Sequence, residues 1–217
     1  MSLNKVIAAA REDLGYTELP AGSNRTKYWD AYDSRMQGQP WCVAALWYWF
    51  RQAGERMAFF GGSGTASCSV LLRWYREQGL TVAKEDVEAG DIAILNFKGT
   101  LETQHCGLVV DVQRLPNGDT AYFQTIEGNT SPGLEGSQDN GGCVALKVRY
   151  PRQIVAVCRP QYSPEPVLDY AGHWAEESIR WCIKQGLMKG YEDGTFKPDK
   201  PVTRAELATI LKRLEGQ

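Results

Sequence analysis

The chain has 217 residues, of which 43% are hydrophobic and 23% are charged, and its formal net charge is −2. This size and composition fit one soluble domain, or one domain with a small additional module. The acidic balance and the scattered Lys and Arg residues argue against nucleic acid or an anionic membrane surface as the main partner, because both require a basic face. No stretch is long and apolar enough to span a bilayer, so we expect no membrane span.

The six cysteines show no paired CxxC spacing, so the sequence signals neither a zinc site nor a disulfide framework. They stand at positions 42, 68, 106, 143, 158 and 182. The N-terminal sequence MSLNKVIAAAREDLG lacks the long apolar core of a secretory signal. We therefore expect a protein that is made in the cytoplasm without a signal peptide and that keeps its thiols free.

The sequence QGQPWCVAALWYWFRQA, residues 37–53, contains the most informative cysteine. Pro40 fits a first helical turn, and the apolar spacing after it predicts a helix over residues 41–53 that ends at Gly54. Cys42 then lies in the first turn, where free backbone N–H groups and the helix dipole favour a thiolate. Cys42 is therefore a candidate nucleophile. The structural alternative is a small buried apolar residue.

The remaining pattern places helices before strands. We expect helices over residues 4–14 and 65–78, and a loop or short turns over residues 18–32. The predicted strands cover residues 91–97, 106–112, 120–126, 143–148 and 154–158. This order predicts an α+β domain in which N-terminal helices pack on a mostly antiparallel sheet.

Two strands carry residues that could assist Cys42. His105 stands at the start of the second predicted strand, and Glu127 closes the third. If these strands form a hairpin through PNGD, the two side chains lie at the same end of the sheet, where the carboxylate could fix the tautomer of the imidazole. Asn129 could take this orienting role instead, or could bind an oxyanion. The structural alternative for this segment is a turn.

Two glutamines precede the cysteine. Gln37 and Gln39 could each supply an amide donor to a developing oxyanion, together with the backbone N–H of Cys42. The alternative for each is a solvated loop residue.

These motifs resemble the CHAP family of cysteine amidohydrolases and peptidases, which are relatives of NlpC-like and papain-like enzymes. The likeness rests on SNRTKY, PWCVAALWYWF, AGDIAIL, HCGLVV and IEGNTS, and it covers residues 1–160. The resemblance implies a papain-like α+β fold, amide hydrolysis in peptidoglycan, and no cofactor. It implies Cys42 as the nucleophile, His105 as the general base and acid, Glu127 as the orienting residue and Asn129 as an accessory. The aspartate cluster with which some CHAP enzymes bind calcium is missing, so we expect no metal.

A second module follows a proline-rich segment, PQYSPEPV, which predicts a linker over residues 161–167. Residues 173–186 predict an amphipathic helix, and Thr203 and Glu206 form a capping box at the start of another. Residues 168–217 contain HWAEESI and GLMKGYEDGTFKPDKPVTRAEL, and they resemble a single S-layer homology (SLH) repeat.

The SLH resemblance implies binding to secondary cell-wall polysaccharide, with Arg204 and Glu206 as candidate contacts. Three such repeats commonly pack together, whereas this chain has one. Either three chains associate as a homo-oligomer, or the single copy binds weakly, or it serves mainly in packing. Glu206 also has a structural role in the capping box.

Together the two resemblances predict a peptidoglycan hydrolase, of endolysin or autolysin type, that a wall-binding repeat targets to its substrate. The bond would be the amide between muramic acid and the stem peptide, or one within the stem. With no export signal, release through a holin or by lysis, and hence a phage origin, would bring the enzyme to the wall. The alternatives are a catalytically inactive wall-binding protein and an intracellular cysteine protease or deamidase.

Overall fold

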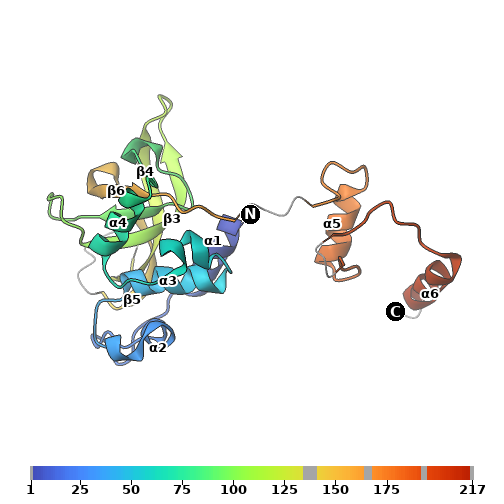
Figure 1. Ribbon diagram of the computed structural model, residues 1–217, viewed down its shortest axis with the longest axis horizontal. Coiled ribbons are helices and arrows are strands. Elements are labelled where there is room, and N and C mark those ends of the chain that lie inside the picture. Colours follow the sequence, from blue (N-terminus) through green and yellow to red (C-terminus); the bar gives the residue numbers. More distant parts are fainter. Residues whose placement is uncertain (1, 134–140, 164–167, 192–194, 216–217) are drawn as a thin grey trace. The chain divides into compact units, whose positions relative to one another are not determined.

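A computed structural model describes residues 2–133, 141–163, 168–191 and 195–215, and the side chains of residues 213–215 are not described (Figure 1). The chain divides into two compact units, residues 1–164 and 165–217. The first unit is α+β with an antiparallel sheet, as the sequence predicts. Of the predicted linker, residues 164–167 lie outside the described residues. Tyr162, which precedes them, stacks on Phe50 of the first unit at a ring distance of 5.7 Å.

The described residues of the first unit form four α-helices: α1 (Ser2–Glu12), α2 (Lys27–Tyr32), α3 (Cys42–Gln52) and α4 (Cys68–Glu77). Three of them were predicted, with bounds that differ by one to three residues. α2 replaces the end of the predicted loop, because Thr26 accepts a hydrogen bond from the Trp29 backbone N–H and caps a single short turn. At the start of α4, Ser67 caps in the same way by accepting from Val70.

The sheet has six strands in the order β1-β6-β2-β3-β4-β5, and each neighbouring pair is antiparallel. Their bounds are β1 Thr81–Val82, β2 Ile92–Leu95, β3 His105–Arg114, β4 Thr120–Thr130, β5 Cys143–Arg149 and β6 Ile154–Cys158. The five predicted strands are confirmed, and β1 is an additional two-residue strand. β4 continues to Thr130, so Glu127 lies inside this strand and not at its end.

The main core lies between the sheet and α1, α3 and α4, which gather on one side of it (Figure 1). α3 is its central helix, since all its residues from Cys42 to Leu46 are buried. Alternate strand residues such as Ile94 and Leu108 face this core, whereas Leu95 and Val109 belong to a smaller cluster. The alternation follows from the two-residue period of a strand.

The second unit contains α5 (Glu176–Lys184) and α6 (Arg204–Glu215). The predicted capping box is present. The Thr203 N–H donates to Glu206 Oε2 at 2.8 Å, and the Glu206 N–H donates to Thr203 Oγ1 at 3.2 Å. Ile179 is buried on α5. Among the described residues, no helix is long and apolar enough to cross a membrane.

Gly128 allows β4 to approach α3 closely. A Cβ atom at this position would lie 2.6 Å from the Ala45 Cβ and 2.8 Å from the Trp41 ring. Both neighbours belong to the fully buried core, so neither can move without disturbing its packing. A glycine at position 128 therefore sets the distance between the start of α3 and the strand that carries Glu127.

We expect Gly128→Ala to lower the free energy of unfolding by about 1–3 kcal/mol, because overpacking a close-packed core costs that much. Urea unfolding followed by circular dichroism measures the change. Gln124→Ala on the same strand is the control, since this half-buried side chain leaves the contact between strand and helix intact. Equal stability of the Gly128→Ala variant and the wild type would show that β4 and α3 do not need this close approach.

Candidate active site

Cys42 is the first residue of α3, and only 7% of it is exposed. The residue before it, Trp41, provides no side-chain cap. The backbone N–H groups of the first helical turn therefore donate no hydrogen bond to that side chain, and they point their positive ends toward the cysteine. The sulfur lies at the helix end that favours a thiolate.

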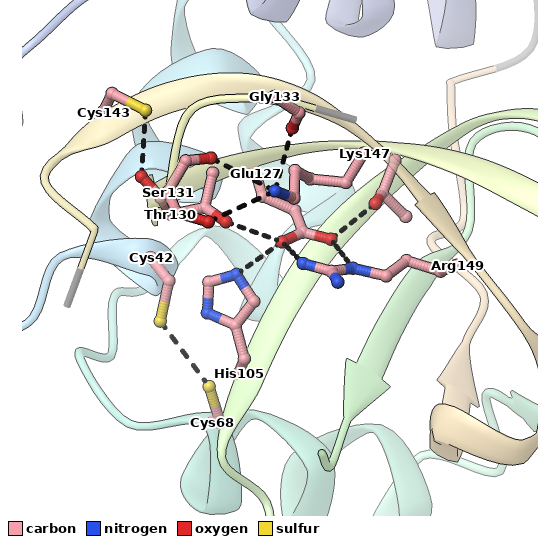
Figure 2. Close-up of polar contacts among 11 residues, drawn as sticks. Cys42, Cys68, His105, Glu127, Thr130, Ser131, Gly133, Cys143, Lys147 and Arg149 are labelled. Carbon is pink, nitrogen blue, oxygen red and sulfur yellow. Dashed lines mark hydrogen bonds and ion pairs between the residues drawn. The ribbon is translucent and has the colours of Figure 1, made fainter. Parts of the chain in front are cut away.

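His105 and Glu127 come together as the sequence predicts. The His105 Nε2–H donates to Glu127 Oε2 at 2.9 Å, and both side chains are fully buried. Figure 2 shows that the other ring nitrogen, Nδ1, is turned toward Cys42. Among the described residues Nδ1 has no hydrogen-bond partner that meets strict geometric criteria. The imidazole thus stands between a carboxylate and a sulfur.

The Glu127 carboxylate is held by more than the histidine. Arg149 binds it through two hydrogen bonds, Nε to Oε1 at 2.7 Å and a terminal nitrogen to Oε2 at 2.6 Å (Figure 2). Thr125 donates to Oε1 at 2.6 Å, and Thr130 donates to Oε2 at 3.3 Å. A buried carboxylate needs such partners to remain charged. The charge and position of Glu127 are therefore fixed before any substrate binds.

Gly107 makes room for this carboxylate. It lies two residues after His105 on β3, and a Cβ there would lie 2.7 Å from Glu127 Cγ and 3.0 Å from Thr125 Cβ. Any larger residue would push the glutamate off the strand surface. The glycine in the HCG motif therefore has a positioning role.

The pKa values of the three residues shift in the directions that an ion pair requires. Burial alone would lower the pKa of His105, but the charge and hydrogen bond of Glu127 and the nearby Cys42 sulfur raise it to about 9. Burial would raise the pKa of Glu127, but Arg149 and His105 lower it to about 2. The pKa of Cys42 is held well below its usual range, first by the thiols of Cys106 and Cys68 and then by His105. At neutral pH these directions favour a thiolate beside an imidazolium.

Two further thiols surround the nucleophile candidate. Cys68, the first residue of α4, has its sulfur 3.8 Å from that of Cys42. Cys106 follows His105 on β3, and the three sulfurs all lie within 4.8 Å of one another. Cys68 is 8% exposed and Cys106 is fully buried. This cluster could not be predicted from the sequence, because its members lie on three separate elements.

The predicted accessory residues have different environments. The Gln37 amide is used locally: it donates to the Thr26 carbonyl and to Asp30, both at 2.9 Å, and accepts from the Thr26 N–H. An oxyanion role for Gln37 therefore has no support in the geometry. Gln39 is exposed, and its carbonyl accepts from the Trp29 indole at 2.8 Å. Asn129 is buried in β4 with a left-handed backbone (φ 54°), so its role stays a prediction.

Sequence reasoning missed Arg149, Thr125, Thr130, Gly107, Cys68 and Cys106. The role of Arg149 could not be inferred from the sequence, because this residue ends the following strand, β5, and contacts Glu127 only across the sheet. A buried glutamate with a nearby strand arginine would have been the signal, but burial is not visible in one sequence.

The second unit carries the other candidate contacts. Arg204 and Glu206 are exposed in the first turn of α6. The Glu206 carboxylate is engaged with Thr203, whose hydrogen bonds lower the pKa of this carboxyl. Glu206 therefore has a structural role, and Arg204 presents an exposed cationic side chain.

Comparison with known proteins identifies the second unit. Residues 168–208 match the S-layer homology domain, so this part of the chain is an SLH domain. Similar proteins include Cell surface glycoprotein 1 of Acetivibrio thermocellus, 50% identical over 60 residues, and the cellulosome-anchoring protein of the same organism, 55% identical over 38 residues. The S-layer protein sap of Bacillus anthracis is 41% identical over 44 residues.

These similarities cover a small part of each protein. They span 25%, 18% and 20% of this chain, and 3%, 8% and 5% of those relatives. No solved structure matches the chain.

One expectation is wrong. The sequence suggested a cytoplasmic protein that reaches the wall only through a holin or lysis, as a phage enzyme would. The SLH domain and the matches to S-layer and cell-surface proteins indicate a cell-surface protein instead.

The chain has two histidines, so the raised pKa of His105 can be measured directly by NMR. We expect the His105 Cε1–H shift to titrate with a midpoint near 9. Glu127→Gln removes the neighbouring charge and should lower that midpoint, and Cys42→Ala should lower it as well.

His173→Gln assigns the two histidine signals, because it removes the His173 resonance. A wild-type His105 midpoint at or below the ordinary value of about 6.5 would contradict the buried ion pair between His105 and Glu127.

Proposed function

We propose that the chain is a cell-surface peptidoglycan hydrolase, in which the first unit cleaves an amide bond and the SLH domain holds the protein on the wall. The catalytic part of this proposal rests on the arrangement of Cys42, His105 and Glu127. The histidine lies between the cysteine and a fixed carboxylate, to which it is hydrogen-bonded at 2.9 Å. A helix-start cysteine, an imidazole and an orienting acid are the groups that thiol hydrolysis requires. The CHAP-like motifs and the helix-on-sheet architecture support a papain-like fold.

The reaction begins with the Cys42 thiolate, which attacks the carbonyl carbon of the amide. The oxyanion that forms is stabilised by the backbone N–H of Cys42, with Gln39 and Asn129 as further candidate donors. His105 then gives its Nδ1 proton to the leaving amine, and a thioester remains on Cys42. Water, deprotonated by the same nitrogen, attacks the thioester, which releases the carboxylic acid and restores the thiolate and the imidazolium.

Glu127 acts by holding the ring. Its carboxylate accepts a hydrogen bond from the Nε2–H, so Nδ1 is the nitrogen that faces the sulfur. The charge of the carboxylate also stabilises the imidazolium form. Arg149, Thr125 and Thr130 prevent the carboxylate from turning away. The site is therefore organised by residues on β3, β4 and β5 before substrate arrives.

The anchoring part rests on the SLH domain and on relatives named for the cell surface and for anchoring. Arg204 is the candidate contact to an anionic cell-wall polysaccharide, since a guanidinium binds such groups well. A single SLH domain has large exposed apolar side chains, including Trp181 and Leu211, which are 56% and 54% exposed. Association of copies, as a trimer, would cover them.

A wall-binding protein without catalytic activity is the second candidate. It is favoured by the relatives, whose printed names describe surface, S-layer and anchoring proteins. The intact arrangement around Cys42 favours the enzyme instead.

Digestion of purified peptidoglycan tests the enzyme. The wild type should release stem peptides or expose new amino termini, and mass spectrometry of the fragments identifies the bond. Cys42→Ala should lose at least about 10³-fold in rate, because nothing else in the site can form the thioester. Cys158→Ala, which removes a buried cysteine from β6, should keep full activity.

Product release by Cys42→Ala at the wild-type rate would overturn the thiol mechanism. If neither protein releases fragments from several wall types while both still sediment with the wall, the chain is a wall-binding protein without catalytic activity.

Arg204→Ala should weaken co-sedimentation with walls that retain their secondary polysaccharide by roughly 10-fold, because a charge-assisted contact is lost. Lys212→Ala is the matched control, an exposed cation further along α6. Light scattering on the same samples gives the oligomeric state. Equal binding by both variants would exclude Arg204 as a contact, and a monomer would exclude the trimer.

A further inference from the structure

The candidate nucleophile and the two thiols beside it are arranged as metal ligands usually are. Cys42, Cys68 and Cys106 come from two helix starts and one strand, and their sulfurs all lie within 4.8 Å of one another. Hydrolysis uses only one of these thiols. The other two therefore need another explanation.

The spacing suits zinc. A tetrahedral Zn²⁺ with sulfur ligands at about 2.3 Å places those sulfurs about 3.8 Å apart. The Cys42 and Cys68 sulfurs are already 3.8 Å apart (Figure 2). Every pair of the three sulfurs is at most 4.8 Å apart, so small side-chain rotations bring the Cys106 sulfur to about 3.8 Å from the other two. The backbone does not have to move far, because each ligand sits on a regular element.

The surroundings also suit a metal with soft ligands. All three cysteines are at least nine-tenths buried, so water competes little for the thiolates. Two of them begin α3 and α4, and the positive ends of both helices stabilise the negative charge that three thiolates bring. Packing against the apolar core keeps the site small.

A nitrogen donor is available beside the thiols. His105 is fully buried, and among the described residues its Nδ1 accepts or donates no hydrogen bond of good geometry. Figure 2 shows this nitrogen on the side of Cys42. Its Nε2–H is bound by Glu127 at 2.9 Å, and a carboxylate in that position is the usual outer partner of a metal-bound histidine. His105 lies outside the group whose ligand atoms are all within 4.8 Å of one another, so its ring has to shift toward the sulfurs to complete a Cys₃His set, which is common for zinc.

We propose that Cys42, Cys68 and Cys106 bind one Zn²⁺ ion as thiolates, with Nδ1 of His105 as the donor for the fourth position. Binding releases into solvent the thiol protons of Cys68 and Cys106 and the Nδ1 proton of the His105 imidazolium. The ion occupies the groups that hydrolysis needs, so a chain loaded with zinc is inactive. This regulatory consequence rests on the proposed hydrolase function, whereas the binding itself does not.

The test uses the reduced full-length chain without oxygen, after treatment with a chelator that is then removed, and titrates it with Co²⁺. Cobalt adopts the tetrahedral thiolate sites of zinc and gives thiolate-to-metal charge-transfer absorption. We expect one Co²⁺ per chain, and full loss of the absorption when Zn²⁺ is added. Cys68→Ser and Cys106→Ser should each weaken binding by at least about 10- to 100-fold, because even outer-shell changes have that effect.

Cys158→Ser and Cys182→Ser are the matched controls, since neither belongs to the cluster, and both should bind like the wild type. Zn²⁺ should also slow alkylation of residues 42, 68 and 106 in the wild type, measured peptide by peptide, but not that of Cys182. This second readout needs no variant to fold. Absence of thiolate-to-cobalt absorption, or equal protection of Cys182, would overturn the proposal.

Hydrolysis and metal binding are separable. If the digestion assay fails while cobalt binds as expected, the cluster is a metal site in an inactive wall-binding protein. If digestion succeeds and cobalt does not bind, the hydrolase stands and the metal proposal falls.

Discussion

The buried ion pair between Glu127 and Arg149 is the interaction on which the site depends. A carboxylate inside a protein stays charged only if other groups replace its water, and here one arginine and two threonines do so. Because the carboxylate is charged and fixed, it can hold His105 at 2.9 Å and raise its pKa. The orientation of the imidazole toward Cys42 thus depends on a residue at the far end of β5.

The second requirement is that the start of α3 lies close to the strands that carry His105 and Glu127. Gly128 brings β4 close to α3, and Gly107 leaves room for Glu127 on β3. Both glycines act by the absence of a side chain. They place a helix N-terminus, which favours a thiolate, beside an imidazole that favours its protonated form. The same packing places Cys68 and Cys106 beside the Cys42 sulfur, so one arrangement suits both a nucleophile and a zinc ion.

Much of this arrangement could be read from the sequence. The helix at Cys42, the five main strands and the meeting of His105 with Glu127 follow from local periodicity and a PNGD turn. Arg149 and the thiol cluster could not be predicted, because they depend on which strands and helices become neighbours in space. The SLH domain was recognisable because its motifs lie within one short segment. Location was misjudged, since it was inferred from the N-terminus and not from that domain.

The most direct measurement is the pH dependence of Cys42 alkylation in the full chain, followed peptide by peptide with a chelator present. A thiolate paired with imidazolium predicts that Cys42 reacts at a pH well below that at which an ordinary thiol reacts, and that His105→Gln shifts its reaction to higher pH. If Cys42 reacts only as an ordinary thiol titrates, near a pKa of about 8.5, the pair of Cys42 thiolate and His105 imidazolium is not formed and the proposed mechanism is wrong.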